Sequence, residues 1–115
     1  MQMMSYATRA YQASSNRRGL REQEADVFRR ANGALRATRD AGEVARTRAL
    51  ADNRRLWSTV LDLMRDPDNA LPAPLRAQIV SIGFAVQRDM DGETPDWDFL
   101  IAINEQIAAG LSGQG

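Results

Sequence analysis

The side chains best suited to acid–base or metal chemistry occur as closely spaced aspartate pairs. The pairs are Asp66 and Asp68, Asp89 and Asp91, and Asp96 and Asp98. Two neighbouring carboxylates can share a proton or hold a divalent cation. Each pair, however, falls in a predicted chain break or at a predicted helix start, where acidic residues cap the backbone and stay solvated. The first pair also lacks the spacing and the closing glutamate of an EF-hand loop.

The residue types that most often carry catalysis are missing. The chain contains no cysteine and no histidine, which excludes a thiolate nucleophile, a disulfide scaffold and the commonest general base. There is no glycine-rich phosphate-binding loop, and no carboxylate cluster has a base positioned by a partner. We therefore expect a protein that is not an enzyme and that has no catalytic residue, metal site or cofactor.

Five arginines form a candidate basic docking stripe. On a helical wheel they fall within one sector about 80° wide, and they are Arg18, Arg21, Arg29, Arg36 and Arg39. Glu22 and Asp26 border this sector and can pair with Arg18 and Arg30 respectively, and no aromatic residue interleaves it to stack on bases. Three interpretations are open: a solvated or internally paired face, a protein-docking face, and a surface that follows an RNA backbone.

The formal charge of zero conceals an asymmetry along the chain. Residues 1–65 contain 13 arginines and 7 acidic residues, a net charge of +6, whereas residues 66–115 contain 2 arginines and 8 acidic residues, a net charge of −6. The two halves could pack together and complement one another. Alternatively, the basic half could present a surface to an acidic partner or to nucleic acid.

Apolar residues recur with periods near 3.6 and never alternate with a period of two, which predicts an all-α fold. We expect a small bundle of four main helices in a single domain over residues 1–115. The helices should run from about Arg17 to Asp40, from about Glu43 to Arg65, over 74–90, and from the cap Thr94 to a stop at Gly113 and Gly115. A short N-terminal helix or docked arm is expected over residues 5–13. Asp66–Asn69 and Asp91–Gly92 should break the chain.

Each predicted helix has one apolar face that should form the core. In the first it is Leu20, Val27, Ala31, Leu35 and Thr38, and in the second Leu50, Asn53, Trp57, Val60, Leu61 and Met64. In the third it is Leu75, Ile79, Ile82, Val86 and Met90, and in the fourth Trp97, Leu100, Ile101, Asn104, Ile107, Ala108 and Leu111. Both tryptophans lie on these faces and are therefore expected to be core anchors.

Some apolar residues miss these faces and form secondary stripes. They are Val80 and Phe84 in the third helix, Phe99 and Ile103 in the fourth, and Leu56 and Leu63 in the second. Helices inside a bundle are buried on two sides, which would account for such stripes. The alternative is an exposed groove that accepts an amphipathic helix of another protein.

The sequence offers no segment for membrane insertion or secretion. No apolar run is long enough to cross a bilayer, and Met1–Tyr6 lacks the charged and apolar regions of a secretory signal. We expect a cytoplasmic protein.

Three motifs, in order, resemble those of the FlaF family of bacterial flagellar proteins. The first is Asn53-Arg54-Arg55-Leu56-Trp57. The second is Asp68-Asn69-Ala70-Leu71-Pro72, followed by Leu75-Arg76-Ala77 and Ile82-Gly83-Phe84. The third is Leu100-Ile101-Ala102-Ile103-Asn104, followed by Ile107 and Gly110-Leu111. Weaker similarity reaches back to Tyr6-Ala7, so the resemblance covers nearly the whole chain, although the acidic loop Asp89–Pro95 departs from it.

The resemblance implies a role in flagellum assembly. Proteins of this family promote flagellin production and are regarded as flagellin-binding secretion chaperones or regulators, with FlbT as a counterpart that restrains flagellin translation. On this basis we hypothesise that Val80, Phe84, Phe99 and Ile103 contact flagellin, with Arg54 or Arg55 at the rim. The alternative is a regulator of flagellin synthesis that binds RNA through the Arg18–Arg39 stripe, or that binds an RNA-binding partner such as FlbT.

Overall fold

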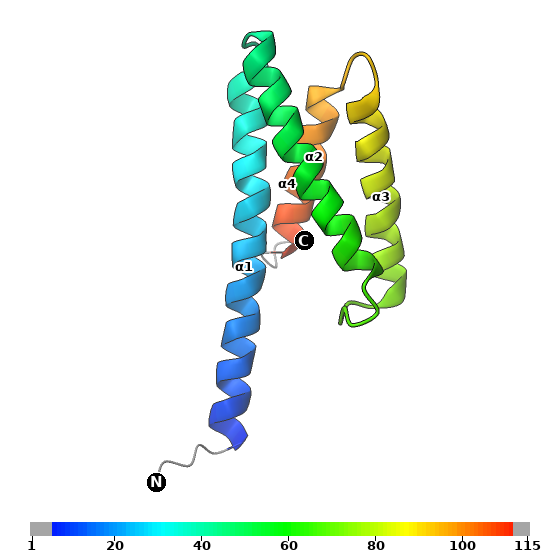
Figure 1. Cartoon of the computed structure of the whole chain (residues 1–115). Coiled ribbons are helices and arrows are strands. Elements are labelled where there is room, and N and C mark those ends of the chain that lie inside the picture. The colour runs from blue at the N-terminus through cyan, green and yellow to red at the C-terminus, as the bar shows by residue number, and fades with distance from the viewer. Residues whose placement is uncertain (1–5, 112–115) are drawn as a thin grey trace.

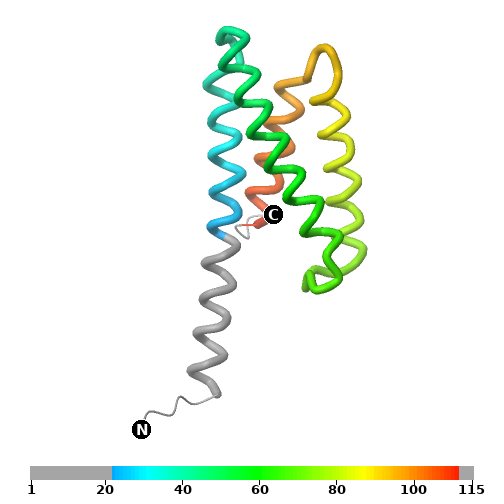
Figure 2. Tube along the Cα trace, in the orientation of Figure 1, coloured from blue at the N-terminus to red at the C-terminus, as the bar shows by residue number. Residues whose placement is uncertain are grey.

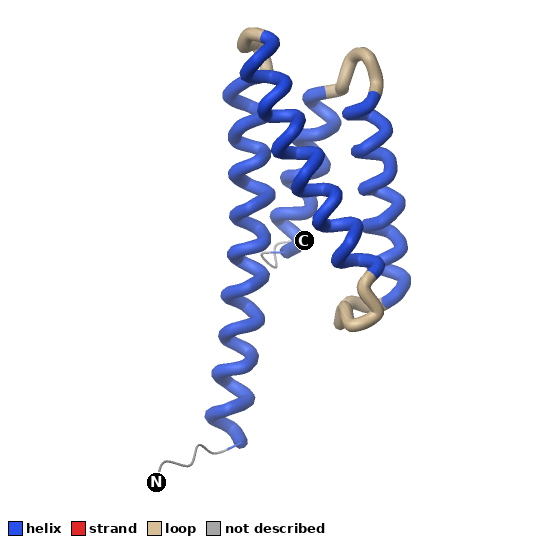
Figure 3. Tube along the Cα trace, in the orientation of Figure 1, coloured by secondary structure: helices blue, strands red, loops and turns tan. Residues whose placement is uncertain are grey.

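A computed structural model describes the backbone of residues 6–111 and the side chains of residues 22–111. Figure 2 colours the part of the chain whose side chains are described. The four helices are α1 (Tyr6–Thr38), α2 (Glu43–Arg65), α3 (Ala73–Asp91) and α4 (Trp97–Leu111) (Figure 1). Within residues 6–111 the remaining segments are loops and turns, and no strand is present (Figure 3). The predicted all-α bundle of four helices is therefore confirmed.

The first helix is longer than the sequence suggested. It begins at Tyr6 and not near Arg17, so the stretch expected to form a short N-terminal helix or arm is the first part of α1. Ser5, at the start of that stretch, lies outside the described residues. So do the side chains of Leu20, Arg18 and Arg21.

Three packings between pairs of helices build the bundle. α1 and α2 form a hairpin, and α3 runs back along the other side of α2 (Figure 1). α4 lies behind α2 in Figure 1 and packs along α1, which brings the last described helix against the first. As a result, α2 is the helix that joins the α1–α4 side of the molecule to α3.

The buried face of α2 is the one that its sequence predicts. Asn53, Trp57, Val60 and Leu61 are all buried. Leu50 and Met64, at the ends of this face, are partly buried against the core. The face therefore extends over about four helical turns.

The buried face of α1 is rotated relative to the prediction. Ala25, Phe28, Asn32 and Leu35 are buried, whereas Val27 is 46% exposed. Phe28 packs edge-on against Trp57, with 5.7 Å between ring centroids. Because a large aromatic ring buries more apolar area than valine, this contact turns Phe28 inward and leaves Val27 at the edge of the α1–α2 interface.

The loop between α2 and α3 is closed by side chains that bond the backbone. The Asn69 amide donates from Nδ2 to the Leu63 carbonyl at 2.8 Å and accepts from the Leu71 amide at 2.9 Å. Arg76 donates to the carbonyls of Leu71 and Met64. Since the last carbonyls of a helix have no partner inside it, Asn69 and Arg76 satisfy the end of α2 and fix where α3 starts.

The start of α4 differs from the prediction in detail. Thr94 was expected to cap the helix, but α4 begins at Trp97. Asp96 acts as the cap, because its Oδ1 accepts the Phe99 amide at 3.1 Å. Asp89 Oδ2 in turn accepts the Asp96 amide at 2.9 Å. One carboxylate from each of two aspartate pairs, Asp89 and Asp96, therefore connects the end of α3 to the start of α4.

Candidate partner-binding site

A chain of hydrogen bonds joins α2 to α4 in the core. The Trp57 indole donates to Asn104 Oδ1 at 2.9 Å, and Asn104 Nδ2 donates to Asn53 Oδ1 at 2.8 Å. Asn53 Nδ2 then points at the Met90 sulfur, 3.3 Å away on α3. All four side chains are almost fully buried. Buried amides need such partners, so this network fixes how three helices face one another.

The network explains several of the residues that carry the resemblance described above. Asn53 and Trp57 belong to the first motif and Asn104 to the third, and the structure brings them into direct contact. Gly83, in the second motif, lies where a Cβ atom would be only 2.7 Å from Leu61 Cδ2 and 3.3 Å from Trp57 Cε3. These residues determine helix packing, and they are unavailable to a partner.

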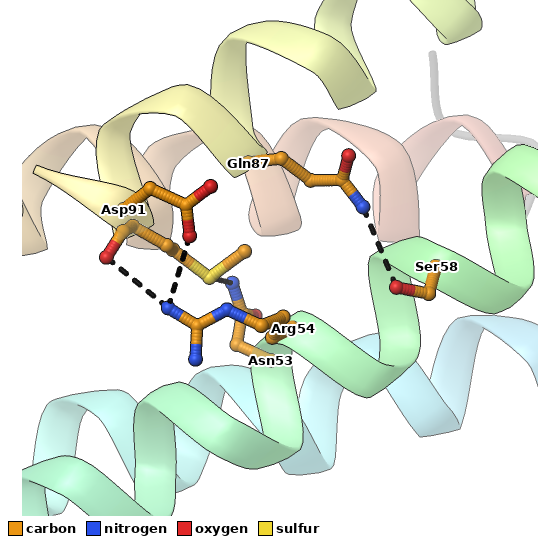
Figure 4. Close-up of polar contacts among 6 residues, drawn as sticks. Asn53, Arg54, Ser58, Gln87 and Asp91 are labelled. Atoms are coloured by element: carbon orange, nitrogen blue, oxygen red, sulfur yellow. Dashed lines mark hydrogen bonds and ion pairs between the residues drawn. The ribbon is translucent and has the colours of Figure 1, made fainter.

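Polar contacts also line the outer face between α2 and α3 (Figure 4). Arg54 donates to the Met90 carbonyl at 3.2 Å and approaches the Asp91 carboxylate at 3.4 Å, at the end of α3. One turn further along α2, Ser58 accepts a hydrogen bond from Gln87. Arg54, one of the two candidate rim arginines, is thus engaged within the molecule.

The four predicted contact residues divide between two helices. Val80 and Phe84 lie on α3, which packs mainly along α2. Phe84 is 42% exposed, and the Arg65 guanidinium covers its ring at 4.9 Å from the centroid. Phe99 and Ile103 lie on α4, which packs mainly along α1, and both are partly buried against the core. Of this set, Phe84 presents the largest exposed apolar surface. A role in binding stays a prediction.

The described arginines of the basic stripe are paired with acidic residues. Arg29 approaches Asp26 at 2.8 Å, whereas the sequence suggested that Asp26 would pair with Arg30. Arg36 pairs with Glu105, and Arg39 pairs with Asp98. Arg36 lies in α1 and Arg39 directly after it, and both acidic partners lie in α4. The basic and acidic halves of the chain therefore complement one another at this interface. Such exposed pairs add little stability, but they offset the charge of the three described arginines of the stripe.

An apolar groove lies between α1 and α2, on the side of the hairpin where Val27 is exposed. Its volume is about 380 Å³. Its apolar lining is Val27, Ala31, Ala34 and Leu56, and its polar lining is Arg30, Asp52, Arg55 and Thr59. We call this set the α1–α2 groove. The secondary apolar stripe of Leu56 and Leu63 is one signal for it in the sequence, although Leu56 is partly buried against the core. Val27 and Ala31, by contrast, belong to the predicted core face of α1.

A second hollow of about 340 Å³ lies between α1 and α4. It is more polar, and two of its lining residues, Arg36 and Glu105, form the ion pair described above. The buried Asn32 also lines it, and its Oδ1 has no hydrogen-bond partner among the described residues. The α1–α2 groove is the better candidate for protein binding, because apolar atoms make up most of its exposed surface even though half of its lining residues are polar.

The described residues contain no group of three or more acidic side chains placed to hold a metal ion. None of the four helices, over the same part of the chain, is both long and apolar enough to cross a bilayer.

Comparison with known protein families gives one match. The family model described as "Flagellar protein FlaF" matches residues 6–111. The chain belongs to the FlaF family. This membership confirms the resemblance carried by the three motifs and gives the protein a role connected with the flagellum. No curated protein and no solved structure matches the chain significantly.

Proposed function

We propose that this FlaF-family protein binds flagellin before export, as a secretion chaperone that promotes flagellin production. The observation that carries the proposal is an open apolar groove in a protein whose family is flagellar. An unassembled protein whose terminal helices are amphipathic needs its apolar faces covered until it assembles. A groove between two helices suits such a helix better than it suits a small polar ligand.

The pairing of the three described arginines of the basic stripe supports protein binding over RNA binding. Arg29, Arg36 and Arg39 each lie within an ion pair. A phosphate backbone would have to displace those carboxylates, which reduces the electrostatic gain on which RNA binding depends. FlbT stays a predicted partner and can be tested in the same way as flagellin.

The test is co-purification with full-length flagellin and with flagellin lacking either terminal region. We expect a stable complex with the full-length protein that is lost on one of the two truncations, and whose affinity changes little between low and moderate salt. If no form of flagellin is retained while flagellin mRNA binds with a steep salt dependence, the chaperone proposal is wrong and the regulator takes its place.

A further inference from the structure

We infer that the α1–α2 groove binds an amphipathic helix of a partner protein, and that acidic residues flank the apolar stripe of that helix. The inference rests on the proposed function in taking that partner to be flagellin. It adds the place on this protein and the charge pattern that the partner must carry.

The shape of the groove fits one helix. Val27, Ala31 and Ala34 follow one another at intervals of four and three on α1, and Asp52, Leu56 and Thr59 do the same on α2. Each wall therefore spans about two turns, or roughly 10 Å. That length receives apolar side chains at positions i, i+4 and i+7 of a docked helix. The two alanines keep the floor shallow, so a partner backbone can approach closely.

The apolar surface continues beyond the groove along α2. Leu63 lies seven residues after Leu56, on the same face of the helix, and is 47% exposed. Val27, on the opposite wall, is 46% exposed. Leu56 and Leu63 therefore follow one another on one face of α2, with Val27 on the other wall of the groove. Apolar side chains grouped in this way indicate an interaction surface more than a single exposed residue does.

The charge pattern selects the partner. Arg30 and Arg55 stand on opposite walls, and neither guanidinium makes an ion pair or hydrogen bond within residues 22–111. Four other arginines, by contrast, each contact an acidic residue; they are Arg29, Arg36, Arg39 and Arg54. Asp52 is the only acidic residue among those that line the groove. A helix with acidic residues on both flanks of its apolar stripe would complement these arginines.

The same charges argue against a second copy of this chain as the occupant. A two-fold contact would place the same patch on both sides. The patch carries two arginines, Arg30 and Arg55, against one aspartate, Asp52. Two copies would therefore bring together surfaces of the same net sign, and like charges across an interface disfavour association.

The absence of cysteine from the sequence makes a direct test simple. Val27→Cys places a fluorescent label in the groove, and Val44→Cys places one on the far end of the hairpin, where Val44 is 76% exposed. The probes are two synthetic helical peptides with the same leucine stripe, one flanked by glutamate and the other by lysine. We expect the glutamate peptide to change the fluorescence at position 27, with roughly tenfold tighter binding than the lysine peptide, and to leave position 44 unchanged.

The second arm uses flagellin itself. Val27→Asp and Arg55→Glu change exposed groove residues, and Val44→Asp and Arg88→Glu are matched changes at exposed residues outside it. We expect each groove variant to bind flagellin at least about tenfold more weakly, with both controls at wild-type affinity and all four variants folded by circular dichroism.

The outcomes separate the two proposals. Suppose that the wild-type protein does not bind flagellin, but the glutamate peptide still changes the fluorescence at position 27. The proposed function is then wrong, and the groove remains a binding site for an acidic helix of another protein. If the wild-type protein binds flagellin and the groove variants bind equally well, the groove assignment is wrong. A loss of binding in Phe84→Asp alone would move the site to α3. A dimer that Val27→Asp converts to a monomer in sedimentation would show a second copy in the groove.

Discussion

Two faces of α2 differ in how their side chains are used. The face toward α3 and α4 carries Asn53, Arg54 and Trp57, and each has a hydrogen-bond partner on another helix. The face toward the groove carries Asp52 and Arg55, whose side chains make no hydrogen bond or ion pair with the described residues. The five-residue motif Asn53–Trp57 therefore contains residues that bond neighbouring helices, together with Arg55, whose side chain bonds none of the described residues. A family motif on a helix need not mark a single site.

The largest effect should come from breaking the packed face at its centre. Asn104→Ala removes two buried hydrogen bonds and leaves the Trp57 indole and Asn53 Oδ1 without partners. We expect a loss of about 2–5 kcal/mol in the free energy of unfolding, measured by chemical denaturation. Gln106→Ala, an exposed change on the same helix, should stay within about 0.5 kcal/mol of wild type. A loss below about 1 kcal/mol for Asn104→Ala would contradict the role of the network.

A smaller effect should come from crowding the α2–α3 contact. Gly83→Leu pushes a side chain into Leu61 and Trp57, and overpacking of this kind costs about 1–3 kcal/mol. Gly33→Ala on α1 is the matched change, because a Cβ atom there meets nothing within 4 Å. It should raise the free energy of unfolding by about 0.5–1 kcal/mol, since alanine favours the helix. Thermal denaturation of both variants checks the pair. If both variants changed the free energy of unfolding by the same amount and in the same direction, helix propensity alone would account for the effect, and the crowding at Gly83 would be contradicted.

Substituting the adjacent arginines Arg54 and Arg55 compares the two faces of α2 directly, and it should change stability the least. Arg54→Ala removes the contacts with the Met90 carbonyl and Asp91, and should lower the free energy of unfolding by about 0.5–1 kcal/mol, because the site is partly exposed. Arg55→Ala should leave stability within about 0.5 kcal/mol of wild type. Flagellin affinity should respond in the opposite way, falling for Arg55→Ala only. Equal losses of affinity for the two variants would contradict the division of the motif.

Much of the fold could be predicted from the sequence because its signals are local. The break at Asp66–Asn69 and the apolar face of α2 were both placed correctly, including the buried amide Asn53. Asn104 was likewise assigned to a buried face and is 1% exposed. Proline, glycine and a strong helical period act within a few residues, so no knowledge of the tertiary structure is needed to interpret them.

The rotation of α1 and the groove could not be predicted in the same way. Two apolar stripes compete on α1, and the one through Val27 and Ala31 is more apolar than the one through Phe28 and Asn32. The packing of Phe28 on Trp57 selects the second stripe, which depends on residues about thirty positions apart. The groove follows from that rotation, because Val27 becomes exposed only when Phe28 turns inward. The cap at Asp96 likewise depends on Asp89, which holds its amide.

The placement of α4 also has a consequence for how the chain folds as it is synthesised. The loop between α2 and α3 is closed by bonds between residues at most 12 positions apart, such as that from Arg76 to the Met64 carbonyl. The Trp97 indole, by contrast, bonds the Leu35 carbonyl across 62 positions. Contacts between distant residues form late, because closing a long loop costs more entropy. On the ribosome, α2 and α3 can pair early, whereas the hydrogen bond from Trp57 to Asn104 can form only after Asn104 has emerged. We therefore expect a nascent chain to reach its native core only after α4 has been translated.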